Sequence, residues 1–401
     1  MQKDYDLIIY GATGFTGRLV VEYLDKNYSD INWAIAGRNE EKLDKISSST
    51  AYKPKYFIAD SEDMAGLNKI AAQTNVIASL AGPFNRYSDK LVGCCVKNNT
   101  HYVDITGENI WVRDLIDKHH EEAEKKGIKI IPSCGYDSIP SDMGCFYLQR
   151  SLGENLLSVD GYHRGGGGVS GGTIESAFTM KNYKTNYSIG HPFLLNSKDF
   201  IEKQNKEASK DTFKIKYIDS IKSWSAPFVM SIANTRVVRR SVELHELNQS
   251  GYGSDFTYKE FMNVKKYSSA LMVSIGLAIL GLMIVSPISS LFRKLFTKPG
   301  NGPDKKTRDN GWFESIFIGK NTNNEFYKLR IYGDGDPGYK TTAKFICESA
   351  LCLVKSDGYL ENTNKGGVLT TATGLGDHLI KRLKNADILF EGPEKISKTI
   401  T

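Results

Sequence analysis

The chain has 401 residues, a formal net charge of +6 and a hydrophobic fraction of 40%. This length fits two domains, and the composition is that of a globular protein. The mild charge, without basic runs interleaved with stacking aromatic residues, gives no reason to expect a nucleic-acid partner. The six cysteines and seven histidines show no metal-ligand spacing, so we expect no metal site and reduced thiols in the cytoplasm.

The N-terminus carries the most informative motif. An apolar run at residues 5–10 leads into Gly11-Ala-Thr-Gly-Phe-Thr-Gly17, a helical pattern and a second apolar run at residues 33–36. A strand, a glycine turn, a helix and a second strand form the unit that binds a dinucleotide, although the spacing here is G-x-x-G-x-x-G. The alternative is a tight turn without a ligand. The predicted cofactor-binding residues of this turn are Gly11, Thr13, Gly14, Phe15, Thr16 and Gly17.

Residue 38 indicates which dinucleotide is bound. NAD-binding proteins usually place Asp or Glu at the end of the second strand, where the carboxylate bonds the ribose hydroxyls. Here that place holds Gly37-Arg38-Asn39. Because a guanidinium pairs well with a phosphate dianion, we predict NADP(H) as the cofactor. A solvated surface arginine is the alternative.

Strand and helix patterns alternate through residue 131. This alternation predicts an α/β fold, with an N-terminal Rossmann-type parallel sheet in a first domain at residues 1–150. Its ligand should lie outside the carboxyl ends of the strands. The expected strands are 5–10, 32–36, 55–59, 75–80, 101–104 and 128–131, and the expected helices are 15–26, 39–49, 61–74, 88–98 and 109–126.

Three loops follow the fourth, fifth and sixth strands, at residues 81–87, 104–108 and 133–142. They should surround the nicotinamide, whatever the substrate is. In the first of them, Ala81, Gly82 and Pro83 are predicted to contact the cofactor.

The same loops supply the candidate catalytic residues. We nominate Tyr136, Asp137 and Tyr87 as proton donors, and the N–H groups of Gly82 and Gly135 as donors to an oxyanion. Each has a structural alternative: the tyrosines would be packing residues, and Asp137 would cap the following helix. By the same reasoning, Asp104 and Glu108 would simply hold their loop by hydrogen bonds.

The pattern changes after residue 150, which indicates an α+β second domain at residues 151–401. A glycine-rich loop at 165–173, with Ser170 or Thr173 capping a helix to about residue 186, would hold an anionic group or be a flexible loop. Residues 190–222 are lysine-rich and are expected to be a long surface excursion. The expected strands are 156–162, 312–318 and 326–332, and the expected helices are 341–354 and 375–384.

One uncharged segment, residues 268–292, is long enough to cross a bilayer core and has basic residues on both sides. A single crossing would separate residues 300–401 from the cofactor domain. We therefore expect a monotopic or peripheral anchor that Pro287 bends back, with a buried core helix as the alternative.

These motifs together resemble the saccharopine dehydrogenase-like oxidoreductases, which include the mycobacterial trans-acting enoyl reductases. The resemblance runs nearly from end to end, and its matching pieces are Gly11–Gly17, Ala36-Gly-Arg38, Ala81-Gly-Pro-Phe84, Tyr102-Val-Asp-Ile-Thr-Gly-Glu108, Gly135-Tyr-Asp-Ser-Ile-Pro-Ser-Asp142, Ser170-Gly-Gly-Thr173, Gly302-Pro303, Gly311-Trp-Phe313 and Gly367-Val-Leu-Thr370.

The resemblance implies a Rossmann NADP-binding domain, a second domain that covers the nicotinamide and, in some members, reduction of a double bond in a lipid or polyketide chain. Animal relatives of this type are associated with lipid droplets and membranes. The leading hypothesis is thus an NADPH-dependent reductase of an enoyl group in a lipid or acyl substrate at a membrane surface or lipid droplet.

Two other hypotheses stay open: a non-catalytic NADPH-binding scaffold, and a saccharopine-type amino-acid dehydrogenase. No arginine cluster suited to an amino-acid adduct is recognised in the sequence, which disfavours the second. The sequence leaves the oligomeric state open, with a homodimer among the alternatives.

Overall fold

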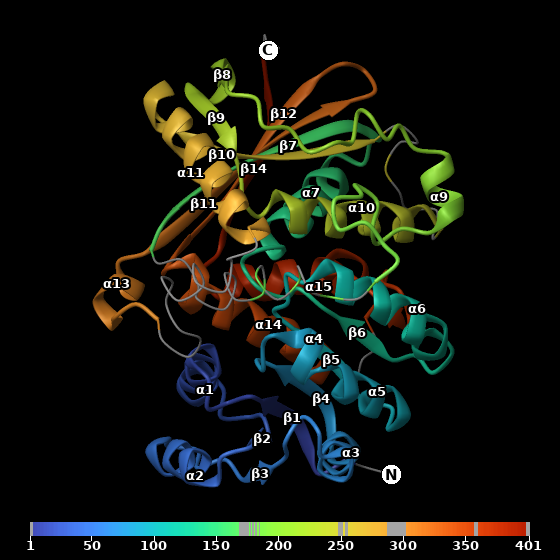
Figure 1. Cartoon of the computed structure of the whole chain (residues 1–401), viewed down its shortest axis with the longest axis vertical. Helices are drawn as coiled ribbons and strands as arrows, with labels where there is room; N and C mark the ends of the chain where they lie inside the picture. Colours follow the sequence, from blue (N-terminus) through green and yellow to red (C-terminus); the bar gives the residue numbers. More distant parts are fainter. Residues whose placement is uncertain are drawn as a thin grey trace.

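Two sheets lie one above the other with a layer of helices between them in the computed structural model (Figure 1). The structure describes residues 3–167, 176, 178, 180, 183, 185–247, 252, 256–286, 302–356 and 360–397.

The first sheet is parallel and contains the predicted dinucleotide-binding unit. Its strands are apolar runs buried on both faces, which is typical of a parallel sheet covered by helices. Its described elements are β1 (Tyr5–Tyr10), α1 (Phe15–Asn27), β2 (Trp33–Gly37), α2 (Glu40–Ser49), β3 (Tyr56–Ile58), α3 (Met64–Gln73), β4 (Thr74–Ser79), α4 (Phe84–Tyr87), α5 (Asp89–Lys97), β5 (His101–Asp104), α6 (Asn109–Lys125), β6 (Lys129–Ile131) and β13 (Gly367–Val368).

The strand order of this sheet is β13-β6-β5-β4-β1-β2-β3. β1 pairs in parallel with β2 on one side and with β4 on the other, so the strand order reverses at β1. A crevice at such a reversal is where open α/β sheets bind their ligands. The α/β class and the predicted Rossmann-type sheet are therefore confirmed, and the predicted positions of its first six strands agree within two residues at each end.

The second sheet is mixed, with strand order β14-β12-β11-β7-β10-β9-β8. β7 pairs in parallel with β10 and antiparallel with β11. The sequence predicted parts of β7, β11 and β12 but not the other strands. The strands are β7 (Leu156–Gly166), β8 (Lys216–Ile218), β9 (Ser223–Pro227), β10 (Thr257–Val264), β11 (Trp312–Asn321), β12 (Phe326–Asp334) and β14 (Leu389–Ile396).

The helices between the sheets share one hydrophobic core with both of them. Leu7 and Val103 of the first sheet, Phe313 and Phe317 of the second, and Phe345 between them belong to a single buried cluster. The chain leaves the first sheet before β7 and returns to it at β13. The division into domains at residue 150 stays a prediction. The helices of this layer are α7 (Ile139–Leu152), α10 (Ser231–Leu247), α14 (Thr342–Val354) and α15 (Thr371–Asn385).

Residues 190–222 are not only a surface excursion. Phe193 and Leu195 are buried, and carbonyl groups of this segment accept hydrogen bonds from arginines of α10. The sequence did not predict these buried contacts, because the segment has few apolar residues among its lysines. The segment contains α9 (Lys198–Glu202), β8 and the short helix η1 (Asp219–Ile221).

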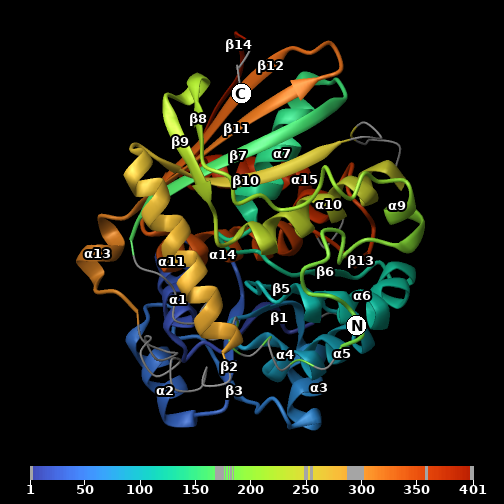
Figure 2. The same cartoon turned by 45° about the horizontal axis from the view of Figure 1, so that its top comes forward.

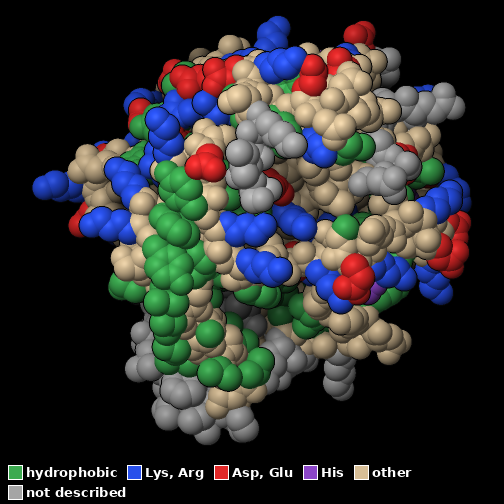
Figure 3. Space-filling view, turned by 90° about the horizontal axis from the view of Figure 1, so that it is seen from above, with side chains coloured by type: hydrophobic (Ala, Val, Ile, Leu, Met, Phe, Trp, Pro, Cys, Tyr) green, Lys and Arg blue, Asp and Glu red, His purple; other side chains and the backbone are tan. Residues whose placement is uncertain are grey.

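The apolar segment forms α11 (Tyr267–Val285), which packs on β9 and β10 along one side (Figure 2). Ala270 is its buried residue, whereas Met272 is 73% exposed and Leu282 is 69% exposed. The buried-core alternative is thus wrong for these residues. Figure 3 shows that apolar side chains gather in a stripe over this helix. Residues 287–292, including Pro287, lie outside the described residues, as do Ser170 and Thr173.

α11 is long and apolar enough to cross a membrane by length and composition alone. Exposed basic residues flank it in the sequence, namely Lys265 and Lys266 directly before the helix and Lys305 and Lys306 of α13 (Lys305–Asp309) after it.

Candidate active site

The glycine turn between β1 and α1 is tightly packed. Gly11 has a φ of +81°, and a Cβ on it would lie 2.8 Å from the Ala81 nitrogen. A Cβ on Gly17 would lie 2.4 Å from the Gly11 carbonyl oxygen. The turn therefore needs glycine at both positions, because an added side chain would collide with backbone.

The N-terminus of α1 is available to a phosphate. The helix begins after Gly14, which provides no side-chain cap, so its first N–H groups are not satisfied by a neighbouring side chain. Such a helix end, opened by small residues at the reversal point of a parallel sheet, fits a dinucleotide diphosphate.

The far part of the chain covers this turn. The Phe15 ring lies 4.7 Å from the Tyr339 ring, which is in η2 (Pro337–Thr341), and the Arg308 guanidinium lies 5.3 Å from the Phe15 centroid. Gly302 approaches the same ring so closely that a Cβ would lie 2.5 Å from it. Phe15 thus joins the cofactor turn to the C-terminal third of the chain.

Arg38 is exposed at the end of β2, as predicted. Burial and the negative charge of Asp60 raise the pKa of Tyr10 to about 12, and the positive charge of Arg38 opposes this rise. The following residue, Asn39, caps α2 by accepting a hydrogen bond from the Lys42 N–H at 2.8 Å. Arg38 is therefore placed beside the end of β1, where the ribose end of a dinucleotide would lie. Its contact with the phosphate stays a prediction.

Two buried carboxylates hold the three predicted loops side by side. Glu108 accepts hydrogen bonds from the N–H groups of Phe84 and Asn85, both at 3.0 Å, and so joins the second loop to the first. Asp104 accepts from the Ser133 N–H at 3.0 Å and from the Thr106 N–H at 2.9 Å. The predicted convergence of these loops is confirmed.

The surroundings of Asp104 change its acidity. Burial raises the pKa of this fully buried carboxyl to about 7, and its backbone hydrogen bonds oppose the rise. Burial also raises the pKa of Glu108.

Tyr136 and Asp137 lie half-buried in the loop that precedes α7. The Tyr136 N–H donates to the Thr342 Oγ1 at 3.1 Å, and its ring packs edge-on against Phe313 at 5.2 Å. Burial, followed by the charge of Glu260, raises the pKa of Asp137 to about 6. A carboxyl of this kind can still hold a proton near neutral pH, which a general acid requires.

The other nominated groups are placed as follows. Tyr87 is half-buried at the end of α4. The Gly82 N–H donates to the Leu80 carbonyl at 3.2 Å, so this donor is already engaged. The residue that precedes α7 is Ser138, but its hydroxyl bonds Asn234 rather than capping the helix.

A polar network from α10 and β10 reaches the loop before α7. The sequence did not predict it. The Asn234 Nδ2 donates to Glu260 at 3.0 Å, and the Asn234 Oδ1 lies 3.3 Å from the Ser138 hydroxyl. The Tyr258 hydroxyl donates to Glu260 at 2.7 Å. These residues come from α10 and β10, which the sequence did not predict, so no local pattern could have brought them together.

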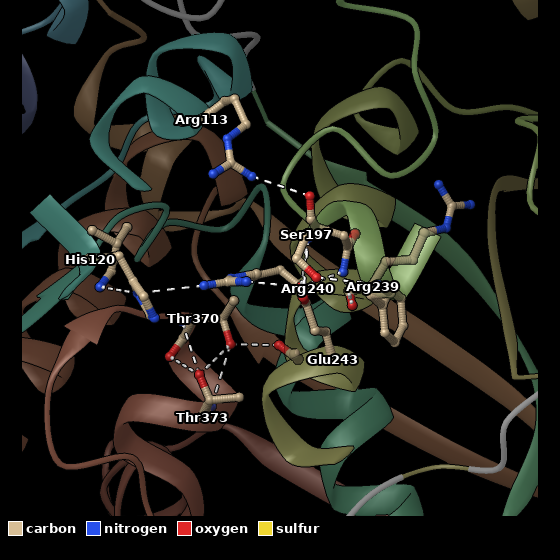
Figure 4. Close-up of polar contacts among 12 residues, drawn as sticks. Arg113, His120, Ser197, Arg239, Arg240, Glu243, Thr370 and Thr373 are labelled. Carbon is tan, nitrogen blue, oxygen red and sulfur yellow. Dashed lines mark hydrogen bonds and ion pairs between the residues drawn. The ribbon is translucent and has the colours of Figure 1, made fainter. Parts of the chain in front are cut away.

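A cluster of buried arginines on α10 was also missed in the sequence. Arg240 donates to Glu243 at 2.8 Å and lies 3.5 Å from His120, as seen in Figure 4. Arg239 donates to three backbone carbonyls. Since these donors hold the protein together, the cluster is structural in this arrangement.

A small cavity beside Arg240 has a volume of about 10 Å³, room for about one water molecule. It is too small for an amino-acid adduct. Within the described residues, no group of three or more His, Cys, Asp or Glu is placed to hold a metal ion.

Known proteins are similar to this chain over nearly its whole length. A protein of Mycobacterium tuberculosis with the provisional name trans-acting enoyl reductase is 31% identical, covering 97% of this chain and 97% of its own. A trans-acting enoyl reductase of Mycobacterium leprae is 29% identical over 97% of this chain and 98% of its own. The fold resembles that of saccharopine dehydrogenase (L-Glu forming) from Saccharomyces cerevisiae, with a TM-score of 0.56 at 15% identity over 99% of this chain and 100% of that one.

The family model of the saccharopine dehydrogenase NADP binding domain matches residues 7–131, which contain the glycine turn and Arg38. NADP(H) is therefore the cofactor, and the protein is an NADP-dependent oxidoreductase. The chain belongs to the family of saccharopine dehydrogenase-like oxidoreductases, together with the trans-acting enoyl reductases.

Proposed function

We propose that this protein uses NADPH to reduce an enoyl or related double bond in a lipid or acyl substrate at a membrane surface. The observation that carries the proposal is the end-to-end similarity to trans-acting enoyl reductases, combined with half-buried proton donors at the cofactor edge of the first sheet.

The chain's own residues would divide the work as follows. The N-terminus of α1 binds the diphosphate, Arg38 pairs with the ribose phosphate, and Ala81, Gly82 and Pro83 line the cofactor. The bound NADPH supplies a hydride. Tyr136 or Asp137 then delivers a proton to the resulting carbanion or enolate, with Tyr87 as a further candidate, and such a positioned acid typically contributes about 10²–10⁴-fold in rate.

The proposal is tested with the purified protein, NADPH and a long-chain enoyl thioester. We expect oxidation of NADPH with formation of the saturated thioester, identified by mass spectrometry. Binding of NADPH without turnover would instead favour a scaffold. Turnover with a polar amino-acid adduct alone would favour a saccharopine-type dehydrogenase.

The membrane part of the proposal rests on α11. Its exposed apolar stripe and nearby lysines match the two attractions that hold a monotopic protein to an anionic surface. Burying one exposed side chain such as Met272 in the acyl region contributes roughly 1.5–3 kcal/mol, so several together suffice for attachment. We accordingly place the protein in the cytoplasm, attached to a membrane or lipid droplet.

Sedimentation with anionic phospholipid vesicles tests this attachment. Met272→Glu should lower the bound fraction, because a carboxylate would replace an apolar contact at a negative surface. The control is Met64→Glu, which alters another exposed methionine, on α3. Equal binding of both variants and the wild type would contradict the proposed anchor.

A further inference from the structure

The turn before α11 carries positive charge at a place where a helix disfavours it. Lys265 and Lys266 are exposed directly before the first helical residue, Tyr267. The N-terminus of a helix has a partial positive charge, so acidic residues stabilise it and basic residues do not. The first turn of α11 contains no acidic residue, and Lys266 at the N-cap has no oxygen to offer the free N–H groups. These two lysines therefore have a use other than the stability of the helix.

The strand register brings a third lysine to the same end of the second sheet. Val264, the last residue of β10, pairs with Trp224 of β9, so the chain that leaves β10 runs beside the turn that enters β9. This turn between β8 and β9 contains Lys222, which is exposed. Asp219 is the acidic residue of the turn, so the three lysines leave an excess of positive charge. None of the three forms an ion pair with another described residue.

Three aromatic rings lie in a row next to these lysines. Tyr217 of β8 pairs with Trp224 in the strand register, and their ring centroids are 5.3 Å apart. The Trp224 ring lies 5.0 Å from the ring of Tyr267 on its other side. Tyr217 is 42% exposed and Tyr267 is 52% exposed. Because tyrosine and tryptophan combine an apolar ring with a polar tip, they gather at the boundary between water and lipid.

The aromatic row continues into the apolar stripe of α11. Leu271, Ile275 and Ile279 follow Tyr267 at every fourth position, which places them along one side of the helix, and all three are exposed. β8 and β9 lie beside the start of this helix (Figure 2). Along this edge the order is thus lysines, then aromatic rings, then aliphatic side chains. The same order of charged, interfacial and apolar layers leads from water into a bilayer.

Protection of an edge strand does not explain the whole arrangement. Lysines on an exposed edge such as β8 prevent it from pairing with other chains. That explanation suits Lys216, which lies on β8. It does not apply to Lys265 and Lys266, because they follow β10, a strand that is paired on both sides. Exposed aromatic rings at an edge would also favour association rather than prevent it.

We propose that six residues form a belt that binds the headgroups of an anionic phospholipid bilayer. The protein then attaches with the β8–β9 edge of the second sheet toward the bilayer and with the start of α11 at headgroup depth. The belt rests on the proposed membrane attachment and adds to it the charge of the lipid and the orientation of the protein. The residues of the headgroup belt are Tyr217, Lys222, Trp224, Lys265, Lys266 and Tyr267.

Tryptophan fluorescence tests the depth of the belt. Vesicles of phosphatidylserine and phosphatidylcholine carry bromine atoms either close to the headgroup or near the end of the acyl chain, and bromine quenches a nearby indole. The wild type should be quenched more strongly by bromine close to the headgroup, and Trp224→Phe should lose most of this quenching. Trp312→Phe is the control, since Trp312 is also half-buried but lies on β11, which two strands separate from β9.

A double substitution tests the charge of the belt. Lys265→Gln combined with Lys266→Gln should lower the partition coefficient onto the anionic vesicles by about tenfold or more, since each lysine near such a surface contributes roughly a fivefold factor. The control is Lys42→Gln combined with Lys45→Gln, which removes the same charge from exposed positions of α2. Binding of NADPH with wild-type affinity checks that each variant is folded.

The outcomes separate the belt from the proposals on which it rests. Equal losses in the two double variants would show an effect of net charge alone and overturn the belt. Quenching of the bound wild type that Trp224→Phe leaves unchanged would also overturn it, while the attachment by α11 would stand. A wild type that binds no vesicles would refute the attachment together with the belt. Reduction of enoyl thioesters is measured without vesicles and decides the proposed reaction separately.

Discussion

The two sheets hold their buried carboxylates in different ways. In the first, Asp104 and Glu108 each accept two hydrogen bonds from backbone N–H groups, beside one from the Tyr102 and Ser176 hydroxyls respectively. In the second, Glu260 accepts from the Asn234 side chain and faces His163. A backbone donor is fixed by the chain, whereas a side chain can rotate or exchange its proton. The first arrangement therefore fixes the shape of loops chiefly through the chain itself, whereas the second depends on the rotamers of side chains.

The strongest test of this contrast is to delete each carboxylate. Asp104→Ala strands two buried N–H groups that cannot turn to other partners, which should lower the free energy of unfolding by about 3–5 kcal/mol. Glu260→Ala should cost less, about 1–3 kcal/mol, because Asn234 and Tyr258 can rearrange. Urea unfolding monitored by circular dichroism measures both. Equal losses would remove the distinction between the two sheets.

The second test concerns turnover. Tyr136→Phe should lower kcat by about 10²-fold while the Kd for NADPH stays at the wild-type value, since only the proton is lost. Asp137→Asn reports separately whether the neighbouring carboxyl delivers the proton instead. Steady-state kinetics and cofactor titration separate the two quantities. If both variants turn over normally, the proton comes from another group.

The third test lies at the cofactor edge of the first sheet. Arg38→Ala should weaken NADPH binding by roughly 1.5–3 kcal/mol, the worth of a hydrogen bond to a charged group, and leave NADH binding nearly unchanged. Fluorescence titration with both cofactors gives the comparison. Equal losses for NADPH and NADH would assign Arg38 a structural role.

The smallest effect is a change in pH dependence. The pKa of Asp104 is about 7 in the folded protein against an ordinary value of 3.8, so the folded state holds a proton that the unfolded state has released. Asp104 therefore contributes stability at low pH that is lost as the pH rises through about 7. Asp104→Asn should flatten this part of the stability curve. Asp44→Asn, on an exposed position of α2, should leave the curve unchanged.

The first sheet could be predicted because its signals are local. The alternation of apolar runs with helical patterns places strands and helices without any long-range information, and the turn from Gly11 to Gly17 is a contiguous motif. The convergence of three loops followed from topology alone, since the carboxyl ends of parallel strands share one edge.

The second sheet could not be predicted to the same extent. His163, Glu260 and Ser315 lie on strands far apart in the sequence, and their strand register is set by tertiary pairing. Arg239 and Arg240 of α10 are buried, although arginine is mostly an exposed residue. Their partners are carbonyl groups and a carboxylate, which have no sequence signature.

The late return of the chain to β13 has a consequence for synthesis. Leu7, Ile9 and Val103 of the first sheet pack in the same core as Phe345, which belongs to a helix made long after the strands at residues 5–131. Until that helix leaves the ribosome, one face of the nascent sheet carries uncovered apolar surface, a condition that favours aggregation. We thus expect the dinucleotide-binding half to be completed only after residues 342–354 have been made, and its folding to be sensitive to chaperones and to premature termination before them.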